Sequence, residues 1–214
     1  MTMKILALDT ATEACSAALY IDGEITSQYQ LAPREHSRLI LRMLDDLLSK
    51  AKLTVGELDA IAFGRGPGSF MGLRIAAGVV QGIAFAHDLP VIPVSTLKAI
   101  AHRAYDETGI SNVMSCIDAR MDEVYWLACQ HDAAGWSYIG EECVISPDKL
   151  DVQQIMSQQS GSWVAAGTGW ANYLERLLPE DSKQPEVILG DCFPSAEVIA
   201  KLAAEEFKAG NTVP

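Results

Sequence analysis

The residues with the clearest chemical potential lie in a glycine-rich segment, Gly64-Arg65-Gly66-Pro67-Gly68, followed by Ser69. Glycine and proline at this density end a strand in a sharp turn, and a serine in this place is a good N-cap for a following helix. A strand, a glycine loop and a helix in this order can bind phosphate through backbone N–H groups and the helix dipole. The segment therefore predicts either a phosphate-binding loop or a purely structural tight turn.

Neither of the common phosphate-loop patterns is complete. Ser69-Phe70 stands where a Walker loop needs Lys-Ser/Thr, and Met71 replaces the third glycine of the G-x-G-x-x-G frame that begins at Gly66. The helix that follows carries Gly72, Gly78 and Gly82, although each glycine inside a helix costs about 1 kcal/mol relative to alanine. This composition predicts that another element approaches the helix backbone closely.

Two aspartates form the second group of candidate residues. Asp9 ends the apolar run Met3–Leu8, and Asp118 ends the apolar run Asn112–Ile117. Such carboxylates either hold a cation or simply begin a turn. The chain has no H-E-x-x-H, H-x-x-x-H, C-x-x-C or G-x-S-x-G pattern, so we expect neither a zinc or iron site nor a serine-hydrolase elbow.

The charge balance limits the partners that the chain can bind. Sixteen Lys and Arg against 28 Asp and Glu give a net charge of −12 over 214 residues, with no basic run. Proteins that bind nucleic acid through its phosphates normally present a basic face, so we expect the chain to bind RNA or DNA poorly when alone and to need a partner for any such contact. The N-terminus resembles a strand rather than a signal peptide, and the five scattered cysteines are typical of reduced thiols. These features predict a cytoplasmic protein without a membrane span.

The elements that must position these residues occur twice along the chain. In the first half an apolar strand is followed by a hairpin, Cys15–Ile21 and Glu24–Gln30, around Asp22-Gly23. Further strands are expected at Asp59–Gly64 and Leu89–Val94, with helices between and after them. A similar order begins again at Asn112 and ends with a helix over Ser195–Lys208. We predict two α/β lobes, 1–108 and 109–214, in the layout of the actin and Hsp70 folds, in which a pair of strand-end aspartates flanks Mg–nucleotide.

The segment Glu35–Ala51 predicts an amphipathic helix whose apolar stripe is wider than one face requires. Such a stripe is either core or partner surface. As partner surface we select apolar positions of this segment and of the glycine-rich helix: Leu39, Ile40, Leu41, Met43, Leu44, Leu47, Leu48, Gly72, Ala76, Val79, Val80 and Ile83.

Several stretches together resemble the bacterial TsaB (YeaZ) family. They are ILALDTATEACSAAL (Ile5–Leu19), HSRLILRML (His36–Leu44), LDAIAFGRGPGSFMGLRIAAGVVQGIAF (Leu58–Phe85), LPVIPVSTLKAIA (Leu89–Ala101) and IDARMDEVYW (Ile117–Trp126). They cover most of the first 125 or so residues, and the remainder matches more loosely. One departure is Met71, where threonine is usual.

The resemblance implies a duplicated ribonuclease-H-like fold of the actin/Hsp70 class and a place in the synthesis of N6-threonylcarbamoyladenosine in ANN-decoding tRNAs. It implies a non-catalytic scaffold that binds the TsaD transferase, together with the TsaE ATPase, and that pairs with itself through the same helical face when alone. No cofactor or metal is expected. Catalytic relatives carry an H-x-x-x-H metal pair after the strand that corresponds to Val91–Val94, and here the two positions hold Thr96 and Ile100, which cannot replace imidazole as metal ligands.

The alternative is an enzyme, a Mg-nucleotide phosphohydrolase or kinase-like protein. Its cleft, or a vestige of it, would be formed by the strand-end aspartates and the glycine loop: Asp9, Thr10, Arg65, Gly66, Gly68, Ser69 and Asp118.

Overall fold

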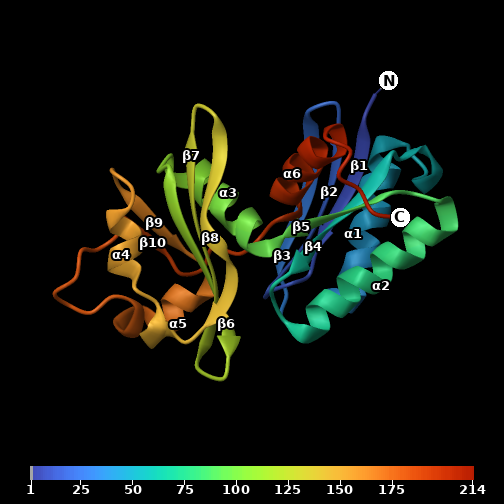
Figure 1. Cartoon of the computed structure of the whole chain (residues 1–214). Coiled ribbons are helices and arrows are strands. Elements are labelled where there is room, and N and C mark those ends of the chain that lie inside the picture. Colours follow the sequence, from blue (N-terminus) through green and yellow to red (C-terminus); the bar gives the residue numbers. More distant parts are fainter. Residues whose placement is uncertain (1) are drawn as a thin grey trace. The chain divides into compact units, whose positions relative to one another are not determined.

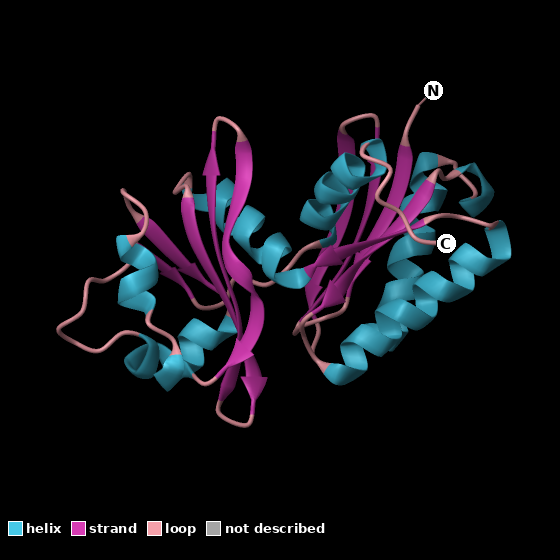
Figure 2. Ribbon diagram, viewed as in Figure 1, coloured by secondary structure: helices cyan, strands magenta, loops and turns pink. Residues whose placement is uncertain are grey.

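The computed structural model describes residues 2–214, which divide into two compact units. Of the described residues, unit 1 comprises 2–99 and 194–214, and unit 2 comprises 100–193. Each unit contains one five-stranded sheet (Figures 1 and 2).

The sheet of unit 1 has the strand order β3-β2-β1-β4-β5. Its strands are β1 (Lys4–Asp9), β2 (Ala14–Ile21), β3 (Glu24–Leu31), β4 (Ala60–Gly66) and β5 (Val91–Ser95). The first three form an antiparallel meander, whereas β4 and β5 run parallel to β1. The carboxyl ends of β1, β4 and β5 therefore meet at one edge, where Asp9 and the glycine loop lie.

Three helices cover this sheet. The helices α1 (His36–Ala51) and α2 (Phe70–His87) lie on one face, and α6 (Ala196–Lys208) lies on the other (Figure 1). Along β1, Leu6 and Leu8 face α1 and α2, while Ile5 and Ala7 face α6. The continuous apolar run that predicted a strand buried on both faces is thus confirmed.

The sheet of unit 2 repeats this plan with the order β10-β9-β6-β7-β8. Its strands are β6 (Asn112–Arg120), β7 (Glu123–Asp132), β8 (Gly135–Ile145), β9 (Trp163–Ala166) and β10 (Val187–Leu189). The meander β6-β7-β8 is antiparallel, and β9 and β10 run parallel to β6. The predicted recurrence is therefore present, with β6 in the place of β1 and Asp118 in the place of Asp9.

The smaller elements complete the chain. They are the helices α3 (Thr96–Thr108), α4 (Val152–Ser157) and α5 (Thr168–Leu177), with short 3₁₀ turns η1 (Val55–Glu57) and η2 (Pro147–Lys149). The helix α3 begins in unit 1 and continues into unit 2.

The division into units differs from the predicted boundary at residue 108. The last helix returns to unit 1, where Ile199, Ala200 and Ala203 are buried against the sheet. Its N-terminus is fixed there by Ser16, whose Oγ accepts a hydrogen bond of 2.8 Å from the Ala196 backbone N–H. A boundary drawn along the sequence cannot include a helix that comes back from the far end of the chain.

Candidate functional site

The glycine loop between β4 and α2 packs directly on the turn that follows β1. A Cβ atom at Gly68 would overlap the Ala11 carbonyl oxygen, and one at Gly72 would overlap the Thr10 carbonyl oxygen. Two hydrogen bonds of 2.7 Å join the segments, from the Ser69 N–H to the Ala11 oxygen and from the Thr10 hydroxyl to the Gly72 oxygen. The glycines therefore permit two stretches of backbone to pack closely, which supports the tight-turn interpretation of this loop.

The start of α2 follows the sequence prediction. The Ser69 hydroxyl accepts a hydrogen bond of 3.1 Å from the Gly72 N–H, as an N-cap does. Gly66, with φ of +105°, takes a backbone conformation that favours glycine, and its peptide bond to Pro67 is cis. Arg65 is exposed. Thus the backbone N–H of Ser69 and that of Gly72 are already engaged within the chain.

Asp9 is enclosed at the carboxyl edge of the unit 1 sheet. Its side chain is fully buried, and its Oδ1 accepts a hydrogen bond of 3.1 Å from the Ala11 N–H. Its Oδ2 has no hydrogen-bond partner among the described residues and lies where a Cβ atom of residue 64 would be, so glycine is required there. Burial raises the pKa of Asp9 to about 7, an effect that the Ala11 N–H only partly opposes. The molecule thus retains a carboxyl group that is ionised only in part at neutral pH.

Asp118 has the equivalent position in unit 2 and entirely different surroundings. Its carboxylate accepts hydrogen bonds from the Arg120 N–H at 2.8 Å and from the Arg120 guanidinium at 3.0 Å. Asn172 and Tyr173 of α5 donate to the same group at 2.9 and 3.3 Å. These donors fix the turn after β6 and hold it against α5, so Asp118 is a structural anchor for that turn.

The structure brings most of the predicted cleft residues together in unit 1, where Asp9, Thr10, Gly66, Gly68 and Ser69 share one edge of the sheet. Asp118 belongs to unit 2. Among the described residues no group of three or more His, Cys, Asp or Glu side chains gathers in a way that would hold a metal ion. Thr96 and Ile100 are both buried.

The predicted partner surface requires a correction. Most of the residues selected on α1 and α2 lie in the core of unit 1 and are not available to a partner: Ile40, Met43, Leu44, Leu47, Leu48, Gly72, Ala76 and Val80. Leu39, Val79 and Ile83 are partly buried against the same core. Of the selected set Leu41 is exposed, at 56%, so the excess width of the stripe corresponds to this residue. The physical reason is that the regular apolar stripe of a helix is the face that packs on its own sheet.

The exposed apolar surface lies instead on the outer side of α2. Phe85 is 93% exposed, and Gly78 and Gly82 precede it by seven and three positions, which places all three on one side of the helix. A Cβ atom at either glycine would meet no atom within 4 Å, unlike one at Gly68 or Gly72. By length and composition alone, α2 is the one helix of residues 2–214 that could cross a membrane. In the structure its inner side packs on the sheet, and its outer side exposes Gly78, Gly82 and Phe85 together with the polar side chains of Arg74 and Gln81.

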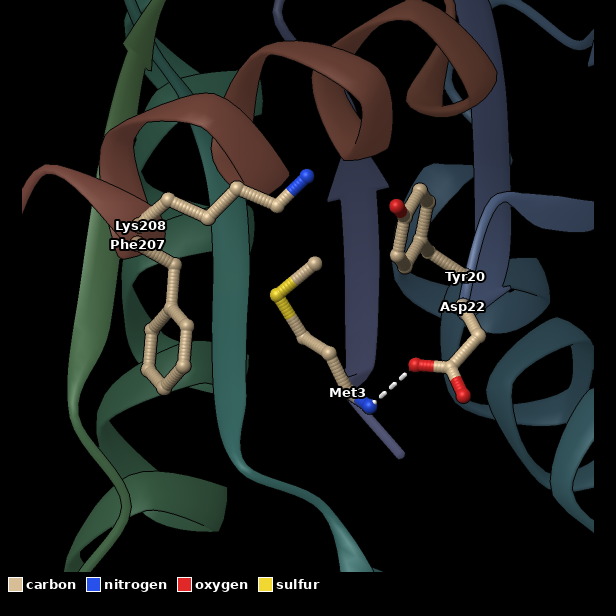
Figure 3. Close-up of a pocket in the computed structure, with 5 residues that line it drawn as sticks. All are labelled: Met3, Tyr20, Asp22, Phe207 and Lys208. Carbon is tan, nitrogen blue, oxygen red and sulfur yellow. Dashed lines mark hydrogen bonds between the residues drawn. The ribbon is translucent and has the colours of Figure 1, made fainter. Parts of the chain in front are cut away.

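A separate pocket of about 490 Å³ lies between the start of β1, the end of β2 and the end of α6 (Figure 3). Its lining combines Met3, Tyr20 and Phe207 with the charged side chains Asp22 and Lys208. Asp22 accepts a hydrogen bond of 2.6 Å from the Met3 N–H. None of the predicted site residues lines this pocket.

Comparison with known proteins places these features in a family context. A family model described as "TsaD: tRNA N6-adenosine threonylcarbamoyltransferase" matches residues 22–204. The proteins named "tRNA threonylcarbamoyladenosine biosynthesis protein TsaB" of Escherichia coli K12 and Haemophilus influenzae are 43% and 40% identical to the chain. Each alignment covers 99% of this chain, and 90% and 89% of the respective relative.

A solved structure agrees with these matches. The structure titled "YeaZ from Pseudomonas aeruginosa" superposes with a TM-score of 0.90 at 44% identity, over 99% of this chain and 95% of that one.

Proposed function

The chain belongs to the TsaB (YeaZ) family, and from this premise we propose that it is the non-catalytic scaffold and activator of a TsaD-type transferase. The assembly would form N6-threonylcarbamoyladenosine in ANN-decoding tRNAs, with a TsaE-type ATPase as its further component. The names of the relatives support the pathway, and the outer surface of α2 supports the scaffold role.

The observation that carries the proposal is the contrast between the two sides of α2. Glycine inside a helix is unfavourable by about 1 kcal/mol relative to alanine, so the presence of Gly78 and Gly82 in α2 requires an explanation. No neighbour within the chain supplies one, because a Cβ atom at either position would meet open space. Small residues let a second helix approach closely, and an exposed phenylalanine beside them adds apolar area that drives association. We define Gly78, Gly82 and Phe85 of α2 as the α2 face.

A TsaD-type transferase suits this face for a structural reason. Because the TsaD family model matches most of the chain, such a partner would present a related sheet-and-helix unit. Two related units can pair through equivalent helices about a pseudo-two-fold axis, and two identical copies can pair in the same way. The same face would then serve a homodimer when the transferase is absent.

The catalytic and nucleic-acid roles fall to the partners. The chain has Thr96 and Ile100 where catalytic relatives carry a metal-binding histidine pair, and neither side chain is a metal ligand of that kind. Its net charge of −12 disfavours direct binding to the phosphates of tRNA. We propose that tRNA contacts the complex chiefly through the other proteins and that the complex works in the cytoplasm, away from membranes.

The test is binding and activation by a Phe85→Glu variant. A buried charge at the centre of the interface should weaken the affinity for the TsaD-type transferase by about 30-fold or more, the loss expected for a hot-spot residue. Gln30→Glu adds the same charge at an exposed position of β3 and should bind like the wild type. Leu44→Glu is unsuitable, because Leu44 is in the core and the variant would unfold. Undiminished binding and tRNA modification with Phe85→Glu would place the interface elsewhere.

One observation favours a second candidate, a Mg-nucleotide phosphohydrolase or kinase-like enzyme. Asp9 keeps an oxygen without a hydrogen-bond partner at the carboxyl edge of parallel strands, where ligands of open α/β sheets bind. This candidate predicts binding of Mg–ATP by the isolated chain, lost in Asp9→Ala. Calorimetry with millimolar Mg–ATP distinguishes the two, because the scaffold proposal predicts no heat of binding.

A further inference from the structure

Residues 2–214 form two sheets with four edge strands, and three of these edges carry features that hinder pairing with another chain. The strand β5 contains Pro93, and its Val91 already pairs with Val213. The strand β10 is three residues long. In β8 residues 140–142, Gly-Glu-Glu, stand opposite Leu127 alone, so this edge carries a bulge with two carboxylates.

The fourth edge strand, β3, has none of these features. Its eight residues pair with β2 in an unbroken register, and no strand of the described chain pairs with its outer side. It contains no proline, lysine or arginine, and its one charged residue, Glu24, is at its first position. A long, regular and nearly uncharged edge is a template for a strand of another chain.

The pairing with β2 shows which backbone groups of β3 face outward. Beyond the end of the ladder and in the same register, the Ala32 N–H donates to the Glu13 oxygen at 3.0 Å. Hydrogen-bonded pairs recur at every second residue of an antiparallel ladder, so the even-numbered residues of β3 bond to β2. The backbone groups of the odd-numbered residues therefore point to the outer edge: Ile25, Ser27, Tyr29 and Leu31.

The side chains of these four residues share the sheet face that α6 covers. Ile25 packs against the apolar cluster beneath α6, and the Ser27 hydroxyl donates to Glu197 of α6 at 3.2 Å. Tyr29 and Leu31 follow at the period of a strand and are 40% and 57% exposed. Two large apolar side chains thus remain exposed beside the outer edge of the sheet.

We propose that a second copy of this chain pairs with β3 across a two-fold axis, so that the two β3 strands run antiparallel and join two unit 1 sheets into one. With the axis at Gln28, all four outward residues of each copy are paired. Leu31 of one copy then lies opposite Ile25 of the other, and Tyr29 lies opposite Ser27. The strand is therefore complementary to itself, as a two-fold interface requires.

The charges beside the strand fit the same arrangement. Glu24 lies opposite Ala32 of the second copy, close to that copy's Arg34, and neither charged side chain forms an ion pair within residues 2–214. The antiparallel direction places the two copies of Glu24 at opposite ends of the interface. Glu197, the other carboxylate beside β3, is paired with Lys201 at 3.6 Å. Because each copy carries a net charge of −12, added salt should strengthen this pairing.

The test is disulfide crosslinking of the isolated chain under a mild oxidant. The background carries Cys143→Ser, which removes the one exposed cysteine of the described residues, and Phe85→Glu, which removes pairing through the α2 face. Gln28→Cys faces its own copy in a non-hydrogen-bonded pair, where Cα atoms are close enough for a disulfide. It should form a linked dimer at least about 10-fold faster than Thr26→Cys or Gln30→Cys alone. Mixing the last two variants should restore fast crosslinking, because residues 26 and 30 are opposite each other in this register.

Two further changes separate strand pairing from chance collision. Ser27→Pro removes an outward N–H and leaves the ladder with β2 intact, and Leu31→Lys places a charge at the outer edge. Each should slow crosslinking by Gln28→Cys about 10-fold. Val144→Lys is the matched control, since Val144 is 53% exposed on the edge strand β8, and it should leave crosslinking unchanged. Urea unfolding shows that each variant is folded.

Equal crosslinking rates at positions 26, 28 and 30 would overturn the inference, as would the absence of a dimer with Gln28→Cys. Crosslinking that persists undiminished in both Ser27→Pro and Leu31→Lys would overturn it too. The experiment uses the chain alone, so its outcome is independent of the proposed activation of a transferase.

Discussion

Asp9 and Asp118 occupy the same position in two copies of one sheet plan, but their carboxyl groups differ in hydrogen bonding and burial. Asp118 accepts hydrogen bonds from Arg120, Asn172 and Tyr173 and thereby stabilises the turn after β6. Asp9 is fully buried with a single N–H on one oxygen and none on the other. In the copy that belongs to unit 2 the carboxylate stabilises the local fold, whereas in unit 1 it opposes folding whenever it is ionised. Equivalent positions in a duplicated fold therefore do not imply equivalent chemistry.

The largest effect that distinguishes the two aspartates should be the pH dependence of stability. The folded-state pKa of Asp9 is raised from 3.8 to about 7, so the folded chain binds its proton more tightly than the unfolded chain. Protonation of Asp9 therefore stabilises the fold. This stabilisation is complete below pH 3.8, is lost as the pH rises through about 7, and amounts to about 4 kcal/mol in total. Urea unfolding of Asp9→Asn between pH 4 and 8 should lack this decline relative to the wild type. If the free energies of unfolding of the two proteins instead change in parallel with pH, the pKa of Asp9 is not raised by burial.

The second effect concerns Asp118. Asp118→Ala removes a buried acceptor that serves both the turn after β6 and α5, and should lower the free energy of unfolding by about 3 kcal/mol. Urea unfolding at pH 7, followed by tryptophan fluorescence, measures the loss. A variant as stable as the wild type would mean that the carboxylate is not an anchor, and the contrast with Asp9 would vanish.

The smallest effect contrasts the inward and outward glycines of α2. Gly72→Ala places a Cβ atom against the Thr10 carbonyl and should destabilise the chain by about 2 kcal/mol. Gly78→Ala meets no neighbour and should stabilise it by about 1 kcal/mol through helix propensity. The same Gly78→Ala protein should bind the transferase less tightly, because a methyl group stands in the way of the second helix. If Gly78→Ala binds as well as the wild type, close approach at this position is excluded.

Much of the fold could be predicted from periodicity and repetition. The apolar run before Asp9 indicated a strand buried on both faces, and its recurrence before Asp118 indicated a duplicated unit; both are present. The N-cap role of Ser69 was also predictable, because it depends on local geometry alone. The boundary between the units was not, because α6 returns to the first sheet through tertiary packing.

The candidate surface was less predictable than the fold. The apolar stripe of α1 is regular because it packs on its own sheet, so the strongest pattern marked the core instead of the partner surface. On α2 nearly every position is small or apolar, and no period separates the inner side from the outer.

The central claim is that the chain activates a transferase through the α2 face and performs no chemistry with Asp9. The most direct test is the rate of threonylcarbamoyl transfer to tRNA by the TsaD-type transferase and the TsaE-type ATPase, measured without the chain and with wild-type, Asp9→Asn or Phe85→Glu protein. We predict that the wild type and Asp9→Asn stimulate transfer equally, that Phe85→Glu stimulates it little, and that the chain alone gives no product. Loss of stimulation with Asp9→Asn, or turnover by the isolated chain, would contradict the account.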